Sequence, residues 1–140
     1  MPKRDAELVA EVRRAFDAYS RGDFDAAMKN VHPQIEFVPP GGQHPIKGAA
    51  GFRAWMEPDA FESQAVEPLD CRVVGNKVLI RMRTHIRGAG SGIEADFLAW
   101  GVWTYDEAGL NTRAEIYLDH EAAEALEAVG LSEQDAHADS

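Results

Sequence analysis

Three side chains in this sequence could take part in acid–base chemistry. His44 carries the imidazole considered for it, because histidine titrates near neutral pH and can both give and take a proton. Tyr19 offers a hydroxyl that can donate a hydrogen bond to a ligand oxygen, and Asp119 offers a carboxylate. Each also has an ordinary use: a loop histidine, a hydroxyl bonded to a backbone carbonyl, and a helix cap. We favour these structural uses, so the catalytic residues stay undetermined.

Other motifs give weaker signals for chemistry. The lone Cys71 can form neither an intramolecular disulfide nor a thiolate metal site, and it falls in an expected strand. Ser91 lacks the strand-to-helix turn that exposes a hydrolase serine, and the glycine-rich residues 87–92 precede a strand rather than a phosphate-binding helix. No two histidines stand at metal-ligand spacing. We therefore expect no metal, no cofactor and no nucleophilic catalysis.

Length and charge exclude several classes of protein. With 140 residues the chain is long enough to bury a core in one domain. Its 14 basic and 24 acidic residues give a net charge of −10, which repels phosphate backbones, so nucleic acid is not an expected partner. No segment approaches the roughly 20 apolar residues of a membrane span, and acidic residues interrupt the start of the chain. We expect a cytoplasmic protein without membrane contact.

The first half of the chain has helical spacing. Apolar residues recur at three- and four-residue steps and predict a helix over residues 5–20. Asp23 can cap a second, shorter helix whose apolar side extends to Val31 and which must end by Pro33, because proline removes an amide donor. After a short strand at residues 35–38, the pattern predicts a third helix over residues 48–56.

The second half alternates between apolar and polar residues, which is typical of half-buried strands. Four strands are expected, at residues 66–74, 78–87, 93–105 and 111–118. Asp119 can then cap a final helix that ends at Gly130. Helices followed by consecutive hairpin strands predict a single α+β domain over residues 1–131, with residues 132–140 as a disordered acidic tail.

One face of the strand at 93–105 carries an apolar stretch where charge is expected. Leu98, Trp100 and Val102 lie on the face that alternation turns outward, where a monomer would leave them in water. We therefore expect a homodimer through this outer face, with Tyr117 of the next strand included. Charged residues of the same face are expected to pair across strands: Arg81, Arg83 and Arg113 with Glu94, Asp96 and Glu115.

Five short segments occur in a familiar order. They are Tyr19-Ser20-Arg21-Gly22-Asp23, Val31-His32-Pro33-Gln34-Ile35-Glu36-Phe37, Lys47-Gly48, Val102-Trp103-Thr104 and Glu115-Ile116-Tyr117-Leu118-Asp119. Together they resemble the SnoaL-like branch of the NTF2-like superfamily, over about residues 5–131. The resemblance implies a cone: a curved, mostly antiparallel sheet wrapped against three N-terminal helices, with a short C-terminal helix and a pocket open at one end.

The resemblance leaves the activity open, because the superfamily includes isomerases, cyclases, dehydratases, epoxide hydrolases and binding modules. Ketosteroid isomerases use a helix tyrosine, an aspartate base and a protonated aspartate. Ala15, Pro39 and Gly101 stand at the corresponding positions here, so that machinery is lost. Polyketide cyclases of the branch use an aspartate on the last strand, where the nearest carboxylates are Asp119 and the outward Glu115.

The implied pocket is lined by the side chains that the expected helices and strands turn inward. The expected ligand-binding residues are apolar apart from two hydroxyls, and they are Tyr19, Phe37, Trp55, Met82, Thr84, Phe97, Trp103 and Ile116. Thr84 could orient a ligand or be an ordinary strand residue. The two tryptophans could stack on a planar ligand or simply fill the core.

Two functions follow from the sequence. The favoured one is a SnoaL-like protein that binds a hydrophobic, cyclic small molecule, with cyclase-, isomerase- or dehydratase-like acid–base chemistry as an extension. Small residues at Ala15 and Gly101 favour it, because they leave room in the cone. The alternative is a non-catalytic interaction or dimerisation module whose pocket is vestigial, and it predicts a filled cone.

Overall fold

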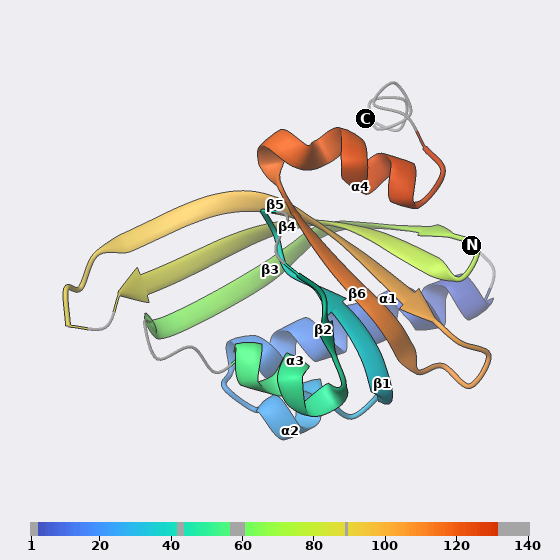
Figure 1. Ribbon diagram of the computed structural model, residues 1–140, viewed down its shortest axis with the longest axis horizontal. Coiled ribbons are helices and arrows are strands. Elements are labelled where there is room, and N and C mark those ends of the chain that lie inside the picture. Colours follow the sequence, from blue (N-terminus) through green and yellow to red (C-terminus); the bar gives the residue numbers. More distant parts are fainter. Residues whose placement is uncertain (1–2, 42–43, 57–60, 89, 132–140) are drawn as a thin grey trace.

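A long helix opens the chain and packs on the inner face of the sheet (Figure 1). The computed structural model describes residues 3–41, 44–56, 61–88 and 90–131. Helix α1 spans Lys3–Ser20 and buries Leu8, Val12 and Phe16 against the sheet, as its apolar spacing predicts. It ends before Gly22, whose φ of 78° is a conformation that glycine adopts without strain.

The second helix is a single turn. Helix α2 spans Phe24–Ala27, and the side chain of Asp23 caps it by accepting a backbone N–H, as expected. The prediction that this helix continues towards Pro33 is wrong, because strand β1 already occupies Val31–Val38. The first residue of β1 pairs with Asn111 of the last strand, and this sheet contact decides the local structure against helical spacing.

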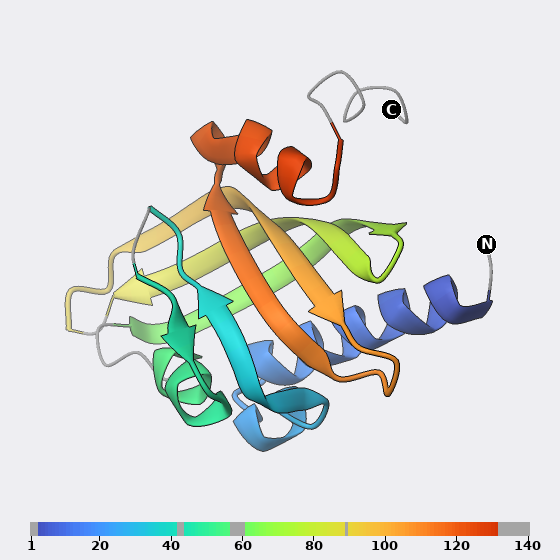
Figure 2. The same ribbon diagram turned by 45° about the vertical axis from the view of Figure 1, so that its right-hand side comes forward.

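Strand β1 and the five strands that follow it form one curved, open sheet (Figure 2), and the remaining elements are these strands with two helices and a 3-10 turn. They are β2 (Ile46–Lys47), α3 (Ala49–Met56), β3 (Phe61–Val74), β4 (Lys77–Gly88), β5 (Glu94–Tyr105), β6 (Asn111–Leu118), the 3-10 turn η1 (Asp119–Glu121) and α4 (Ala122–Ala128). The strand order is β2-β1-β6-β5-β4-β3, and only β1 and β6 pair in parallel among the described strands. The expected α+β class with a mostly antiparallel sheet is confirmed.

The inner face of the sheet follows the predicted alternation. Val78, Ile80 and Met82 of β4 are buried in the cluster that α1 covers, together with Trp103 of β5. Figures 1 and 2 both show α1, α2 and α3 on this side of the sheet and α4 on the other. Residues 132–140, predicted as a tail, lie outside the described residues.

The outer face has a cover that the sequence did not reveal. Helix α4 packs Ala125, Leu126 and Val129 against Leu79 and Val102. Val102 is fully buried there, so the expectation that a monomer leaves this stretch in water is wrong for Val102. The apolar side of the short helix removes it from solvent within one chain.

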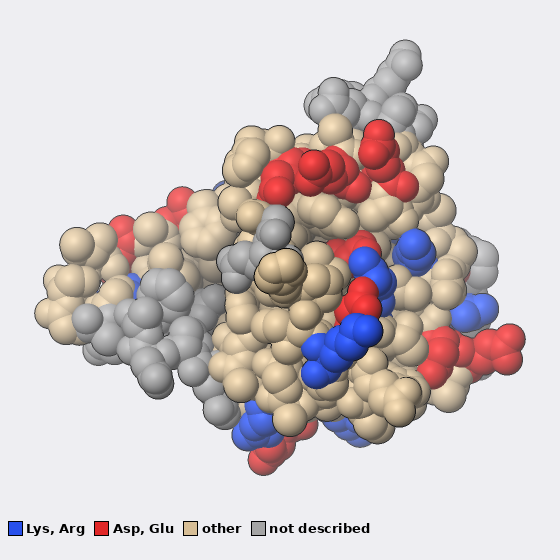
Figure 3. Space-filling model, in the orientation of Figure 1, with Lys and Arg blue, Asp and Glu red and all other residues tan. Residues whose placement is uncertain are grey.

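The rest of the outer face is partly covered. Leu98, Trp100 and Tyr117 keep intermediate exposure, and the last two pack against the cluster under α4. Figure 3 shows acidic side chains gathered over this helix and interleaved basic and acidic side chains on the sheet below it. The homodimer through this face stays a prediction, and the apolar surface available for it is smaller than expected because Val102 is buried.

Asp119 does not cap the final helix, which corrects the expected structural role. The N–H of Leu118 is satisfied instead by the Glu121 carboxylate, at 2.9 Å. Asp119 forms an ion pair with Arg81, whose guanidinium lies 4.6 Å from the centre of the Trp100 ring; the Asp119 Oδ1 to Arg81 Nη1 distance is 2.7 Å. The 3-10 turn η1 precedes α4, so the carboxylate that accepts the N–H at the start of this turn belongs to Glu121, two residues after Asp119.

The predicted charge pairs on the outer face are only partly correct. Arg113 contacts Glu115, but on its own strand, and it also contacts Glu36 of β1. Asp96 pairs with His85, which was not among the predicted partners, at 2.7 Å. The β4–β5 register explains this, because it places apolar residues, Leu98 and Trp100, opposite the two expected arginines of β4.

Candidate functional site

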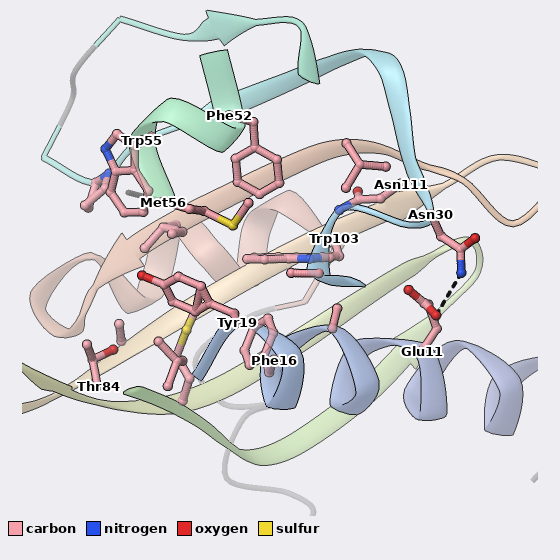
Figure 4. Close-up of a pocket in the computed structure, with 18 of the residues that line it drawn as sticks. Glu11, Phe16, Tyr19, Asn30, Phe52, Trp55, Met56, Thr84, Trp103 and Asn111 are labelled. Atoms are coloured by element: carbon pink, nitrogen blue, oxygen red, sulfur yellow. Dashed lines mark hydrogen bonds between the residues drawn. The ribbon is translucent and has the colours of Figure 1, made fainter. Parts of the chain in front are cut away.

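A cavity of about 240 Å³ lies between α1, α3 and the inner face of the sheet (Figure 4). Its wall is mainly apolar and aromatic, which is typical of a small-molecule site. All the expected ligand-binding residues except Phe37 line it: Tyr19, Trp55, Met82, Thr84, Phe97, Trp103 and Ile116. Their placement follows from helical spacing in α1 and α3 and from alternation in the strands, whereas their binding role stays a prediction.

Phe37 lies outside the lining, contrary to expectation. Its side chain is fully buried, and its ring centre is 4.7 Å from those of both Phe52 and Trp55. Those two rings line the cavity, so they stand between Phe37 and any ligand. Alternation predicted the inward direction of Phe37 correctly but could not show that α3 would cover it.

Tyr19 brings a hydroxyl to the cavity wall from α1. Its Oη is buried and has no hydrogen-bond partner among the described residues, so the expected bond to a backbone carbonyl is absent there. Burial raises the pKa of the Tyr19 hydroxyl above its usual value, because the charged form would lose its hydration. The group therefore stays neutral and can donate a hydrogen bond at physiological pH.

The other two acid–base candidates lie away from the cavity. His44 is exposed in the segment before β2 and is absent from the lining. The Asp119 side chain is 62% exposed and is held by Arg81 beside the outer face. The structure therefore brings together Tyr19 and the apolar set, but neither His44 nor Asp119.

The inner wall also contains a polar end that the sequence reasoning missed. Glu11, Asn30 and Asn111 all line the cavity, from α1, the segment before β1 and the start of β6 (Figure 4). The Asn30 Nδ2 donates to Glu11 Oε1 at 2.9 Å. Arg14 donates to both Glu11 oxygens, at 2.7 Å each, and so neutralises the carboxylate.

The sequence contained a signal for Glu11 of this polar end but none for Asn111. Glu11 lies three residues after Leu8 and four before Ala15, so helical spacing already placed it beside the buried stripe. Asn111 had no such signal, because strict alternation would turn it outward. The β5–β6 register shifts at this point, and the irregularity leaves Asn111 buried on the cavity side.

Of the two small residues expected to make room, only Ala15 lines the cavity. The space at Gly101 is already filled, since a Cβ there would lie 2.6 Å from the Trp103 ring and 2.7 Å from the Met82 methyl. The inference that Gly101 enlarges the pocket is therefore wrong. Pro39 is buried and lies outside the lining, whereas its neighbour Pro40 belongs to it.

The described residues offer neither a candidate metal site nor a helix that could span a membrane. No three histidine, cysteine, aspartate or glutamate side chains among them are grouped to hold a metal ion. None of the helices in the described ranges is long and apolar enough to cross a membrane.

Comparison with known proteins places this geometry among related domains. Residues 12–113 match the family model described as SnoaL-like domain. No curated protein matches the chain at a significant level. An NTF2-like protein of unknown function from Burkholderia pseudomallei superposes with a TM-score of 0.71 at 17% identity, covering 88% of this chain and 97% of that one.

Two other solved structures add ligand and reaction contexts of their own. TerC, co-crystallised with polyporic acid, has a TM-score of 0.70 and 20% identity, over 82% of this chain and 93% of that one. SalBIII is an epoxide hydrolase/cyclase-like enzyme with a role in pyran ring formation in the polyether salinomycin. It has a TM-score of 0.70 and 19% identity, over 83% and 91% of the two chains. At these identities the likeness shows an NTF2-like fold.

Proposed function

The chain belongs to the family of SnoaL-like domains, and we propose that its cavity binds a hydrophobic, cyclic small molecule. The observation that carries this proposal is an apolar cavity with the buried, unpartnered Tyr19 hydroxyl in its wall. A buried polar group without a partner costs about 1–3 kcal/mol, and a ligand oxygen would offset that cost. TerC, which has the same fold, was co-crystallised with a small molecule, and this supports the proposal.

The size and shape of the cavity restrict the ligand. Its volume of about 240 Å³ lies just below the roughly 300–1,000 Å³ that is usual for drug-sized ligands, so a compound of a few rings fits. Phe16 and Trp103 present an edge-to-face pair with ring centres 5.4 Å apart. Such aromatic walls suit a planar, cyclic compound.

The test uses 4-hydroxybiphenyl, an apolar ring compound with one hydroxyl, in titration calorimetry. We expect saturable binding of one molecule per chain, weakened by about 0.5–1.5 kcal/mol in Tyr19→Phe, since one hydrogen bond is lost. The matched control is Tyr117→Phe, which removes the same hydroxyl from outside the cavity lining and should leave the affinity unchanged. Absence of binding to the unmodified protein would contradict the proposal.

Acid–base chemistry is a second candidate, and one observation favours it. Glu11 is the only carboxylate in the cavity lining among the described residues. Tyr19 lies eight residues further along α1, which is roughly 12 Å along a helix axis, so the two groups cannot act on one carbonyl and its neighbouring carbon. Isomerase-, dehydratase- or cyclase-like chemistry would therefore need Glu11 to act as base without Tyr19.

Hydrogen–deuterium exchange at the acidic carbon of 2-tetralone, followed by proton NMR in heavy water, tests this chemistry. A working Glu11 base predicts exchange that saturates with 2-tetralone and is lost in Glu11→Gln. Exchange no faster than in buffer would exclude Glu11 as a base for this class of proton. The Arg14 contacts, which already engage both carboxylate oxygens, favour binding over catalysis.

The alternative of a vestigial pocket is less well supported. It predicts a cone filled by side chains, whereas this cone holds a cavity.

We retain the homodimer as part of the proposal, through Leu98, Trp100 and Tyr117 beside α4. Sedimentation should give a dimer for the unmodified protein and a monomer for Trp100→Glu, and a monomer in both would remove the dimer from the account.

A further inference from the structure

Three separate elements converge at the polar end of the cavity. Besides the Asn30 to Glu11 hydrogen bond, the backbone N–H of Asn111 donates to the Asn30 carbonyl at 2.8 Å. Arg14, which binds Glu11, also donates to the Ala26 carbonyl at 2.7 Å. These bonds connect α1, the segment between α2 and β1, and the start of β6, so the polar end is fixed by tertiary contacts.

Asn111 is incompletely satisfied within this fixed arrangement. Its side chain is 4% exposed, and its Oδ1 is buried without a hydrogen-bond partner among the described residues. Its amide faces the cavity in Figure 4. A buried amide oxygen that faces an apolar cavity is an acceptor for a ligand donor, such as a hydroxyl or an N–H group.

The second unpartnered group lies at the other side of the cavity. Figure 4 shows Tyr19 and Asn111 on opposite sides of Trp103, whose ring lies between them. Among the described residues that line the cavity, the Tyr19 Oη and the Asn111 Oδ1 are the only buried side-chain atoms without a hydrogen-bond partner.

We propose that the cavity recognises its ligand at both ends, with Asn111 as a second anchor that binds a hydrogen-bond donor. The ligand class is then an apolar ring compound with a polar group at each end. At the Asn111 end that group is a hydroxyl or N–H, and at the Tyr19 end a hydroxyl or carbonyl. This inference rests on the proposed function and specifies its ligand.

Neighbouring charges narrow the class further. Glu11 lies in the same polar end, and its carboxylate already engages the Arg14 guanidinium through both oxygens. Arg14 satisfies Glu11 from within the protein, so it does not offer a free cation for an anionic ligand. The second anchor therefore selects a neutral donor, and Glu11 acts as a positioning residue that holds Asn30 in place.

The test compares 4-hydroxybiphenyl with 4,4′-dihydroxybiphenyl by titration calorimetry at neutral pH. The two probes share the same rings, but only the diol can satisfy both anchors at once. We expect the unmodified protein to bind the diol about threefold to tenfold more tightly. In Asn111→Leu and in Tyr19→Phe, one anchor is missing, and the preference should fall to the about twofold that the symmetry of the diol gives.

Tyr117→Phe is the control and should keep the full preference, because Tyr117 lies outside the cavity lining. Equal binding of the two probes by the unmodified protein would overturn the two-ended ligand, as would a full preference that survives in Asn111→Leu. The comparison in the unmodified protein decides the matter even if Asn111→Leu does not fold. If neither probe binds at all, the proposed function itself fails; if both bind equally, only the second anchor fails.

Discussion

The two faces of the sheet are covered by helices in different ways. On the outer face, a short helix lays Ala125, Leu126 and Val129 directly on Leu79 and Val102, and all five are buried. On the inner face, α1 and α3 contribute aromatic side chains that surround a cavity of about 240 Å³. Buried polar atoms without a partner among the described residues occur on both faces, at Trp100 Nε1 and Glu115 Oε2 outside and at Tyr19 Oη and Asn111 Oδ1 inside, but only the inner two line a cavity.

This difference supports the proposed ligand site on the inner face. A cavity by itself weakens a core, because its lining loses dispersion contacts. A buried polar atom without a partner adds a further cost. Both occur together on the inner wall, at Tyr19 and Asn111, and a ligand would offset both at once. The predictions below test whether the faces differ in this way.

The largest expected effect is on the outer face. Leu126 of α4 is 1% exposed against the sheet, so Leu126→Ala should lower the free energy of unfolding by about 2–5 kcal/mol. Urea unfolding at neutral pH measures it. A loss below about 1 kcal/mol would show that α4 packs loosely and that the contrast between the faces is weaker than described.

Two alanine-to-leucine substitutions in α1 should distinguish the packed core from the cavity. Ala18 is 1% exposed and lies outside the cavity lining, so Ala18→Leu should overpack the core and cost about 1–3 kcal/mol. Ala15 lines the cavity, so Ala15→Leu should cost less than Ala18→Leu while weakening the binding of 4-hydroxybiphenyl more than about tenfold. Equal costs for the two substitutions, or unchanged binding in Ala15→Leu, would contradict the position of the cavity.

Stability should fall at alkaline pH, with contributions from both faces. Burial raises the pKa of Tyr19 and Tyr105 on the inner face, and burial followed by the Glu115 charge raises that of Tyr117 to about 12. The unfolded chain releases these protons near pH 10, whereas the folded chain retains them. The stabilisation is therefore complete below about pH 10 and is lost as pH rises towards the folded values, by at most about 1.4 kcal/mol per pH unit for each tyrosine.

Urea unfolding at a series of pH values from 8 to 11.5 checks this prediction. Tyr19→Phe should flatten part of the decline above about pH 10, because phenylalanine has no proton to lose. A decline as steep in this variant as in the unmodified protein would show that the Tyr19 hydroxyl is hydrated rather than buried.

The smallest expected effect concerns the exposed outer charges. Asp96 pairs with His85, and their side chains are 64% and 41% exposed. Asp96→Asn should therefore change the free energy of unfolding by less than about 1 kcal/mol. A larger loss would mean that the outer ion pairs stabilise the sheet more than exposed pairs usually do.

Sequence reasoning located the inner face well because local periodicity determines it. Met82, Thr84 and Trp103 were assigned to the cavity from alternation and a family resemblance, and all three line it. Asn111 was not predicted to line the cavity, because the irregular register between β5 and β6 reverses alternation at the start of β6.

Other differences came from tertiary contacts that no local pattern contains. The second helix stops early because Val31 joins the sheet, and the apolar outer stretch is covered because α4 folds back over Val102. Gly101 leaves no room because Trp103 and Met82 occupy its space. A partner far along the chain determined the first two outcomes, whereas Gly101 is limited by Trp103, two residues away on the same strand, and by Met82 on the neighbouring strand.

The central claim is that ligand binds the inner face, and the three tryptophans test it directly. Trp55 and Trp103 line the cavity, whereas Trp100 lies on the outer face over which Arg81 packs. In a titration with 4-hydroxybiphenyl, followed by two-dimensional ¹H–¹⁵N NMR, the indole N–H signals of Trp55 and Trp103 should move and that of Trp100 should stay. Movement of the Trp100 signal alone, or of none of the three, would contradict the account.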